Sequence, residues 1–401
     1  MSPLPPPQPP RRQRRTAAPP PPVAERLRGA LLGLWLGDLM GHAMRGRNFP
    51  HLPEFPALYA KPQETGPPRA HPRDNSLALG FAACVAHCLL QERQFQVGSL
   101  LKTYRRHAAF LQNAGKLAPL SPPETAPTPT PPPPSPPLEN EPPLPSLEPA
   151  LAKTLETFPL FHSPQGFLEV HLRNAVAPPV FDGVLLRSVP VACFFYADAP
   201  ARIGSVMEEA LATQTGPLGA LASVALAALL SESILSPQAY APTLGLLEAI
   251  QRDMAQAAPA LMHRGLSPAV IQQALAQVNA EVEYAQRSSP NLYAPALNFR
   301  LHAGQLRLSF RLALWELFHA PEPSASDGPG RAIEDVVCRG GSPASQGALT
   351  AALCGARWGR GCLPNPGLEP LLPLPPRGAP LSCGDASFLG SLAEALVATL
   401  N

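Results

Sequence analysis

Aromatic and charged residues are scarce in this sequence. Of its 401 residues, 6% are aromatic and 15% are charged, and the formal net charge is +2. Nucleic-acid binding depends on an excess of lysine and arginine, so this balance gives no general case for a nucleic-acid partner. Glycine is scarce beside proline, with 29 and 56 residues. So much proline prevents regular packing along parts of the chain, and the folded portion is therefore smaller than the length indicates.

The sequence also lacks an export signal and an uninterrupted membrane-spanning run. The apolar stretch GALLGLWLGDLM contains Asp38 and has no small-residue cleavage site after it. No segment reaches spanning length without a charge, a Gly or Pro break or a polar turn. The 7 cysteines are scattered and odd in number. We therefore expect reduced thiols in a cytoplasmic protein without a membrane partner.

One group of possible metal ligands falls within an apolar segment. Cys84, His87 and Cys88 are spaced i, i+3, i+4 within GFAACVAHCLL. A structural zinc site takes four ligands, and only these residues are close in sequence. Because their neighbours are apolar, we expect the two cysteines to pack in the core rather than to bind zinc.

Three proline-rich segments divide the chain. They are residues 1–22, residues 118–149 and the stretch LPNPGLEPLLPLPPRGAP after Cys362. We expect the first to be a disordered Pro/Arg-rich tail, the second a disordered insertion, and the third irregular chain on the surface. Residues 23–401 then form a single helical domain that the insertion interrupts. Proline tracts of this kind can bind a protein partner as polyproline II helices, or act only as spacers.

The rest of the sequence predicts helices. Alanine and leucine runs such as GPLGALASVALAALLSES are long, and few β-branched residues alternate at period two. Ser267 followed by Pro268 is a favourable N-cap and N1 pair for one helix. The fold class we expect is therefore all-α, a compact helical bundle. The predicted helices cover residues 25–43, 76–91, 99–112, 268–286, 300–319, 345–358 and 386–399.

Polar residues interrupt these apolar helices near their ends. In a helical bundle with one cleft at its helix ends, polar residues at those ends line the cleft. We therefore expect these residues to form a common ligand site. For Arg187 we expect a partner, either Asp182 or a neighbouring loop carbonyl, because a buried arginine is normally paired. The polar residues are Asp38, the run Arg73, Asp74, Asn75 and Ser76, the pair Asp182 and Arg187, and the loop residues Gly340, Gly341, Ser342 and Ser345.

The motifs that carry these residues resemble those of the ADP-ribosylglycohydrolase family. RLRGALLGLWLGDLMG is similar to the first-helix pattern RxxGALLGLAxGDALGxxxE, and RDNSLAL lies where the family has TDDTxLAL. DGVLLRSVPVA stands at NGxxMRxxPL, and GGSPASQGALTAALCGARWG stands at GGDTDTxAAIxGALxGAxxG. The resemblance covers most of residues 23–117 and, less closely, 161–366. It implies an all-α ADP-ribosylglycohydrolase-like bundle with a two-magnesium site that hydrolyses a glycosidic bond to ADP-ribose.

The sequence departs from the family at the metal ligands. Two magnesium ions need several carboxylates, and only Asp74 remains at the matching positions. Arg45 and Arg73 would repel the ions. We therefore expect no metal cofactor, with magnesium required only if the family activity is retained. The family's Thr-Asp-Asp-Thr becomes Arg73, Asp74, Asn75 and Ser76, its Asp-Thr-Asp-Thr becomes Ser342, Pro343, Ala344 and Ser345, and the glutamate after its first helix becomes Arg45.

Three functions remain open at this point. The first is a metal-independent ADP-ribose or phosphate binder, because guanidinium groups and helix N-termini hold phosphates. The second is an interaction module that uses the proline tracts. The third is a residual or altered hydrolase that removes ADP-ribose from proteins or small molecules, with Asp74 and Asp38 as candidate catalytic residues. The residues expected to bind ligand are Arg45, Arg73, Asp74, Asn75, Ser76, Asp182, Arg187, Gly340, Gly341, Ser342 and Ser345.

Overall fold

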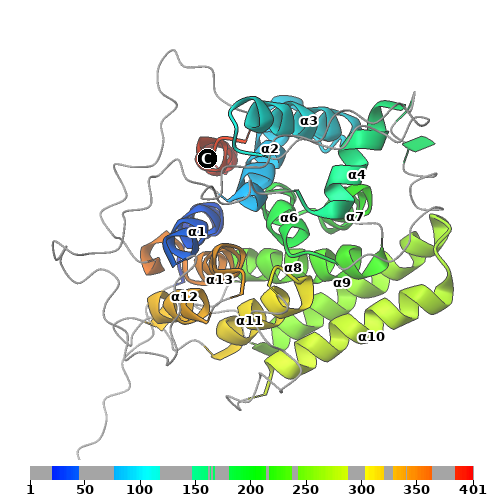
Figure 1. Ribbon diagram of the computed structural model, residues 1–401. Coiled ribbons are helices and arrows are strands. Elements are labelled where there is room, and N and C mark those ends of the chain that lie inside the picture. Colours follow the sequence, from blue (N-terminus) through cyan, green and yellow to red (C-terminus); the bar gives the residue numbers. More distant parts are fainter. Residues whose placement is uncertain are drawn as a thin grey trace, which may run out of the picture.

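The described part of the chain is helical. The structure is a computed structural model that describes residues 20–44, 76–117, 147–160, 163, 166–167, 180–213, 216–236, 243–287, 303–319, 328–339, 341–363 and 384–400. Within these ranges the only β-type pairing is an isolated antiparallel bridge between Phe181 and Gln305. The expected all-α class is confirmed (Figure 1). The helices are α1 (Val23–Met44), α2 (Leu77–Glu92), α3 (Val97–Asn113), α4 (Pro149–Thr157), η1 (Phe158–Leu160), α6 (Gly183–Phe194), α7 (Ala199–Thr213), α8 (Pro217–Leu235), α9 (Thr243–His263), α10 (Pro268–Ala285), α11 (Leu306–His319), α12 (Gly328–Cys338), α13 (Pro343–Trp358), η3 (Arg360–Cys362) and α14 (Ser387–Ala398).

The predicted helices are present, with small shifts at their ends. The first three predicted ranges correspond to α1, α2 and α3, and the last corresponds to α14. α10 begins as expected, with Ser267 as its N-cap and Pro268 in its first turn. α11 begins at Leu306 rather than at 300, because Gln305 before it takes part in the bridge.

Most of the predicted proline-rich tail and insertion lies outside the described residues. The insertion was expected to run to 149, but the Leu147 side chain is 8% exposed and Pro149 begins α4. Burial of this leucine favours a fixed position for the chain around it. The part of the chain that the structure describes therefore resumes at Leu147, before the predicted boundary.

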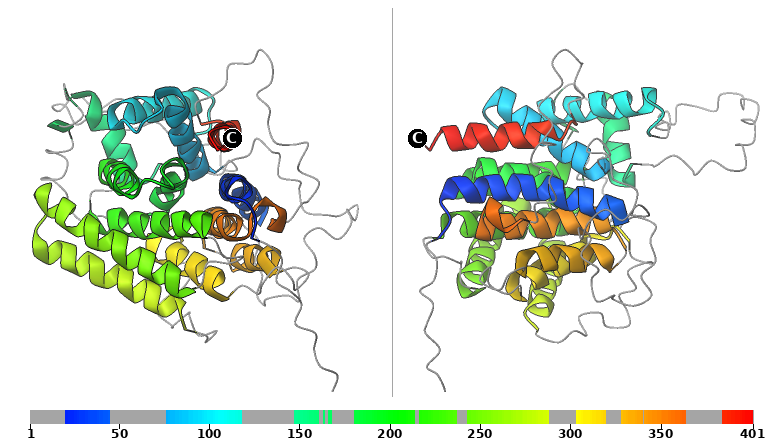
Figure 2. Two further views of the ribbon diagram at one scale, coloured as in Figure 1. Left: turned by 180° about the vertical axis from the view of Figure 1, so that it is seen from behind. Right: turned by 90° about the vertical axis from the view of Figure 1, so that its left-hand side faces the viewer.

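Close backbone contact joins α1 and α13, which run antiparallel side by side (Figures 1 and 2). A Cβ atom added to any of the facing α1 glycines would overlap an α13 carbonyl group. The α1 residues are Gly29, Gly33, Gly37 and Gly41. They face, in that order, Gly355, Ala351, Gly347 and Pro343. Glycine at every fourth position lets the two backbones approach closely, and this fixes the register between the helices.

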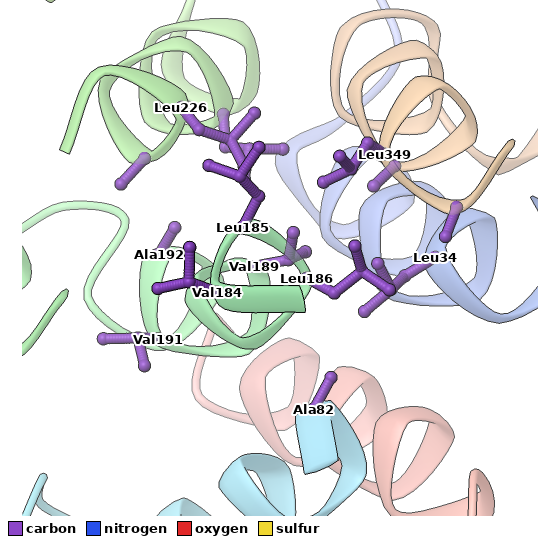
Figure 3. Close-up of a cluster of buried hydrophobic side chains, with 14 of the residues drawn as sticks. Leu34, Ala82, Val184, Leu185, Leu186, Val189, Val191, Ala192, Leu226 and Leu349 are labelled. Atoms are coloured by element: carbon purple, nitrogen blue, oxygen red, sulfur yellow. The ribbon is translucent and has the colours of Figure 1, made fainter. Parts of the chain in front are cut away.

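α6 lies at the centre of the core. Every residue from Gly183 to Cys193 is buried. Figure 3 shows its apolar side chains directed toward Leu34 of α1, Leu226 of α8 and Leu349 of α13. This packing fixes the N-terminal end of α6 beside the α1–α13 pair.

α8 is a core helix. By length and composition it is the one described helix that could cross a membrane, but 83% of its apolar window is buried inside the fold. α6, α7 and α9 pack against it. Its continuous apolar sequence is therefore accounted for by neighbours on all sides.

The cysteines of α2 pack in the core, as predicted. Cys84 is 0% exposed and Cys88 is 7% exposed. The Cys88 Sγ donates a hydrogen bond to Thr103 Oγ1 at 3.1 Å, while the His87 ring packs against Phe388 with centroids 4.4 Å apart. Cys84, Cys88, Cys193, Cys338, Cys354 and Cys362 are free thiols, and Cys383 lies outside the described residues.

Substitution of Gly37 by alanine is expected to destabilise the fold by about 2 kcal/mol or more, because the added Cβ would overlap the Gly347 carbonyl group. Urea denaturation measures the free energy of unfolding. Gly390→Ala in α14 is the matched control, since no atom lies within 4 Å of an added Cβ there. It should be neutral or stabilise by up to about 1 kcal/mol. Equal effects of the two substitutions would contradict the close α1–α13 contact.

Candidate functional site

Asp38 of α1 fixes the start of α2. The Asp38 side chain is 1% exposed and accepts a hydrogen bond from Ser76 N at 2.9 Å and another from Ser76 Oγ. Ser76 is the N-cap of α2, and its Oγ accepts a hydrogen bond from Leu79 N at 3.1 Å. Burial raises the pKa of Asp38 to about 6, although the bonds from Ser76 oppose the rise. Both carboxylate oxygens are thus engaged by the protein.

Asp182 joins three helices through serine hydroxyls. It is the N-cap residue of α6 and is 4% exposed. Its Oδ2 accepts a hydrogen bond at 2.6 Å from Ser309 Oγ of α11, and the hydroxyls of Ser345 and Ser342 lie close enough to lower its pKa. Ser342 Oγ donates in turn to Ser345 Oγ at 3.2 Å. Burial raises the pKa of Asp182 to about 7; the Ser309 bond opposes the rise, and the Glu148 carboxylate adds to it.

Asp38 lies at the N-terminal end of α2, and Asp182 lies at the N-terminal end of α6. Asp38 lies between Gly37 and Gly41, which contact the first turns of α13, and it holds the start of α2. Asp182 begins α6, and the nearby hydroxyl of Ser342, the N-cap residue of α13, helps to lower its pKa. A helix N-terminus carries unpaired N–H groups and partial positive charge. The structure therefore groups Asp38 with Ser76, and Asp182 with Ser342 and Ser345; that these residues form one ligand site stays a prediction.

Gly341 shapes the loop before α13. Its φ of 80° lies in the left-handed region, which glycine adopts without a steric penalty. The turn sets Ser342 at the helix start and leaves the backbone N–H groups of Ala344 and Ser345 in the first turn, where no helical carbonyl can accept from them. This loop retains the shape of an anion-binding or metal-binding turn.

Arg187 does not pair with Asp182, so the sequence-based expectation was wrong. Arg187 is 0% exposed, and its Nε donates to Glu209 Oε1 at 2.7 Å while its Nη2 donates to Thr213 Oγ1 at 2.9 Å. Its Nη1 lies 3.5 Å from Glu148 Oε2. A buried guanidinium group requires such charged partners, and α7 and the start of α4 supply them. Arg187 therefore joins α4, α6 and α7 instead of pairing with Asp182.

The partners of Arg187 and Asp182 were not identified from the sequence. Glu209 also accepts a hydrogen bond from Tyr104 Oη at 3.0 Å, and it is 0% exposed. Nothing in its local sequence separates it from the half-buried Glu208 beside it. Ser309, in contrast, is a small polar residue inside the apolar stretch LRLSFRLAL, and that pattern could have marked it.

Several predicted site residues lie outside the described residues. They are Arg45, Arg73, Asp74, Asn75 and Gly340. Their contribution to a ligand site therefore stays a prediction.

The described residues do not fit a two-magnesium site. Among them, no three His, Cys, Asp or Glu side chains are close enough together to hold a metal ion. Ser76 hydrogen-bonds to both oxygens of Asp38, and Ser309 hydrogen-bonds to Asp182. Magnesium requires octahedral oxygen coordination, and a pair of such ions requires several free carboxylates.

Fold and site together define an all-α protein with a polar site where helix N-termini meet. A comparison with protein-family models matches ADP-ribosylglycohydrolase over residues 19–399. The chain belongs to the ADP-ribosylglycohydrolase family. A similar solved structure is an "ADP-ribosylglycohydrolase-related protein complex", with a TM-score of 0.56 and 20% identity, covering 94% of this chain and 98% of that chain. At this identity the likeness supports the fold alone. The comparison with curated proteins found no match.

Replacing Asp182 by asparagine should remove a pH dependence of stability. The carboxyl pKa is 3.8 in its ordinary state and about 7 in the fold, so between these values the folded protein keeps a proton that the unfolded chain has lost. This contribution to stability falls as pH rises through that window, by about 1.4 kcal/mol for each unit of the shift. Asp182→Asn should therefore gain stability over the parent protein from pH 4 to pH 7.

Urea denaturation of both proteins at several pH values measures this difference. The asparagine can still accept the Ser309 hydrogen bond, so the helix contacts are kept. A difference that does not change with pH would contradict the raised pKa of Asp182.

Proposed function

We propose that this protein binds ADP-ribose or a related phosphorylated compound without a metal ion, and that it lacks the two-magnesium hydrolase chemistry. The observations that carry the proposal are the contact of Asp38 with Ser76 at the start of α2 and the position of Asp182, at the start of α6, beside Ser342 and Ser345 of α13. Hydrogen bonds between protein groups occupy the carboxyl oxygens that a metal ion would need.

The first turn of α13 offers suitable donors for a phosphate group. Backbone N–H groups at a helix N-terminus bind anions, and three such ends together add partial positive charge. Ser342 and Ser345 add hydroxyl groups at the same end. Arg45 and Arg73, predicted from the sequence to lie beside this site, would pair with phosphate oxygens.

The Asp182 carboxyl group makes this binding depend on pH. An ionised carboxylate repels a phosphate, whereas a protonated one does not and can donate a hydrogen bond to it. Because the pKa of Asp182 is about 7, the protonated form is available close to neutral pH. We therefore expect the affinity for a phosphorylated ligand to increase as pH falls from 8 to 6.

Calorimetric titration with ADP-ribose tests the proposal, once with magnesium and once with a chelator. Binding should be the same in both buffers and tighter at pH 6 than at pH 8. Ser345→Ala, Arg45→Ala and Arg73→Ala should each weaken binding by roughly 5-fold or more, the loss of about 1 kcal/mol. Ser205→Ala in α7 is the control, since this half-buried serine belongs to another helix.

Two results would contradict the proposal. Binding that requires magnesium, or release of ADP-ribose from a modified protein, would favour the hydrolase. Absence of binding in both buffers would favour a protein that acts only through interactions with partners.

Magnesium is expected to leave thermal stability unchanged. A ligand stabilises only a folded state that binds it, and the described carboxyl groups are occupied by hydrogen bonds. The thermal midpoint should be equal with low-millimolar magnesium and with a chelator. An increase of several degrees with magnesium would indicate a metal site that includes Asp74, which lies outside the described residues.

A further inference from the structure

The solvent-facing side of α3 has an unusual composition. Its exposed residues recur at positions i, i+3, i+4, i+7, i+8 and i+11, so they form one continuous stripe. The stripe contains three cations, one aromatic ring and no acidic residue, and α3 as a whole contains no Asp or Glu. We name it the α3 stripe; its members are Lys102, Arg105, Arg106, Ala109, Phe110 and Asn113.

The cations of the α3 stripe have no carboxylate partner in the described part of the chain. Salt bridges are recorded there for several other surface arginines, but none for Lys102, Arg105 or Arg106. Like charges at i, i+3 and i+4 spacing repel one another. Burial lowers the pKa of His87 on the neighbouring helix α2, and the positive charge of Arg106 lowers it further. The stripe therefore has an unbalanced positive charge.

Phe110 adds an apolar anchor to this charged stripe. Its side chain is 48% exposed, next to the exposed Ala109 and one turn from Arg106. Arginine and aromatic residues are the types that contribute most to binding at protein interfaces, while lone exposed cations contribute little. The combination is thus better suited to a protein partner than to a purely electrostatic contact.

The α3 stripe is held in a fixed orientation by the opposite side of the helix. Leu100, Leu101 and Tyr104 are 0–1% exposed and pack in the core. α3 lies at the edge of the molecule, on the side away from α10 (Figures 1 and 2). A partner would therefore meet a preformed surface and would not have to order it.

We propose that the α3 stripe is the docking face for an acidic amphipathic helix of a partner protein. The fold itself contains a contact of this kind: Arg28 of α1 binds Glu394 of α14 through two hydrogen bonds of 2.8 Å. Glutamates of the partner would pair in the same manner with Arg105 and Arg106, and an apolar residue one turn away would cover Phe110. Bidentate carboxylate pairing and burial of the ring both stabilise such a complex.

Binding of a synthetic helical peptide to the full-length protein tests this proposal. The probe is about 15 residues long, long enough to form helix, with glutamate and leucine at three- and four-residue spacing. A second peptide has the same composition in scrambled order. Fluorescence anisotropy should show binding of the ordered peptide, and affinity lower by at least about 5-fold for the scrambled one.

Substitutions in the α3 stripe separate this proposal from general attraction to negative charge. Arg106→Glu and Phe110→Ser should each weaken binding of the ordered peptide by at least about 5-fold. Arg287→Glu, at an exposed position just after the end of α10, should leave it unchanged. All these side chains are exposed, so the fold is expected to be retained, and the thermal midpoint checks this.

Three outcomes would overturn the proposal. They are equal binding of ordered and scrambled peptides, unchanged binding by Arg106→Glu or Phe110→Ser, and loss with Arg287→Glu. Phosphatidylserine vesicles and a single-stranded oligonucleotide serve as further probes. In one further result, the ordered peptide fails to bind while the vesicles or the oligonucleotide bind and Arg106→Glu abolishes that binding. In that case the partner would be a lipid surface or a nucleic acid instead of a protein.

Discussion

Backbone contact between α1 and α13 is the constraint on which the rest of the structure depends. The facing small residues leave no space for a Cβ atom, so the helices can take only one register. That register places Asp38 beside the first turns of α13 and places the start of α2 within its reach. The same pair provides Leu34 and Leu349, against which α6 packs, so that Asp182 arrives at the start of α13. The geometry of the candidate site is therefore a consequence of the glycine spacing along α1.

The residues at these helix ends differ from those of the family pattern. In the family pattern, acidic residues and threonines at two loops would bind metal ions between helices. Here Asp182 lies at the start of α6, where the family has asparagine. The hydroxyls of Ser342 and Ser345 lie at the start of α13. Hydrogen bonds from neutral hydroxyls to one carboxyl group need no metal ion to offset accumulated charge. The proposed metal-independent site rests on this arrangement.

The sequence predicted the fold well because its signals were local or came in ordered motifs. Apolar runs, the Ser267 and Pro268 pair and the matched motifs all specify helices without knowledge of distant contacts. It also assigned Asp182 and Ser342 to one candidate site, and that assignment stays a prediction. It could not assign Glu209 to Arg187, because that pairing depends on how α7 crosses α6, and two adjacent glutamates offer no local distinction. The α3 stripe was equally hidden, since which face of a helix is buried follows from packing.

The distance along the chain between α1 and α13 also affects how the protein folds during synthesis. About 300 residues separate Met44 from Pro343. At the usual speed of translation this corresponds to roughly 15–60 s between completion of α1 and appearance of its partner. Throughout that interval the glycine-rich face of α1 has no helix to cover it. Contacts so remote in sequence also slow folding, because the loop must close before they form. This close packing therefore becomes possible only late in synthesis.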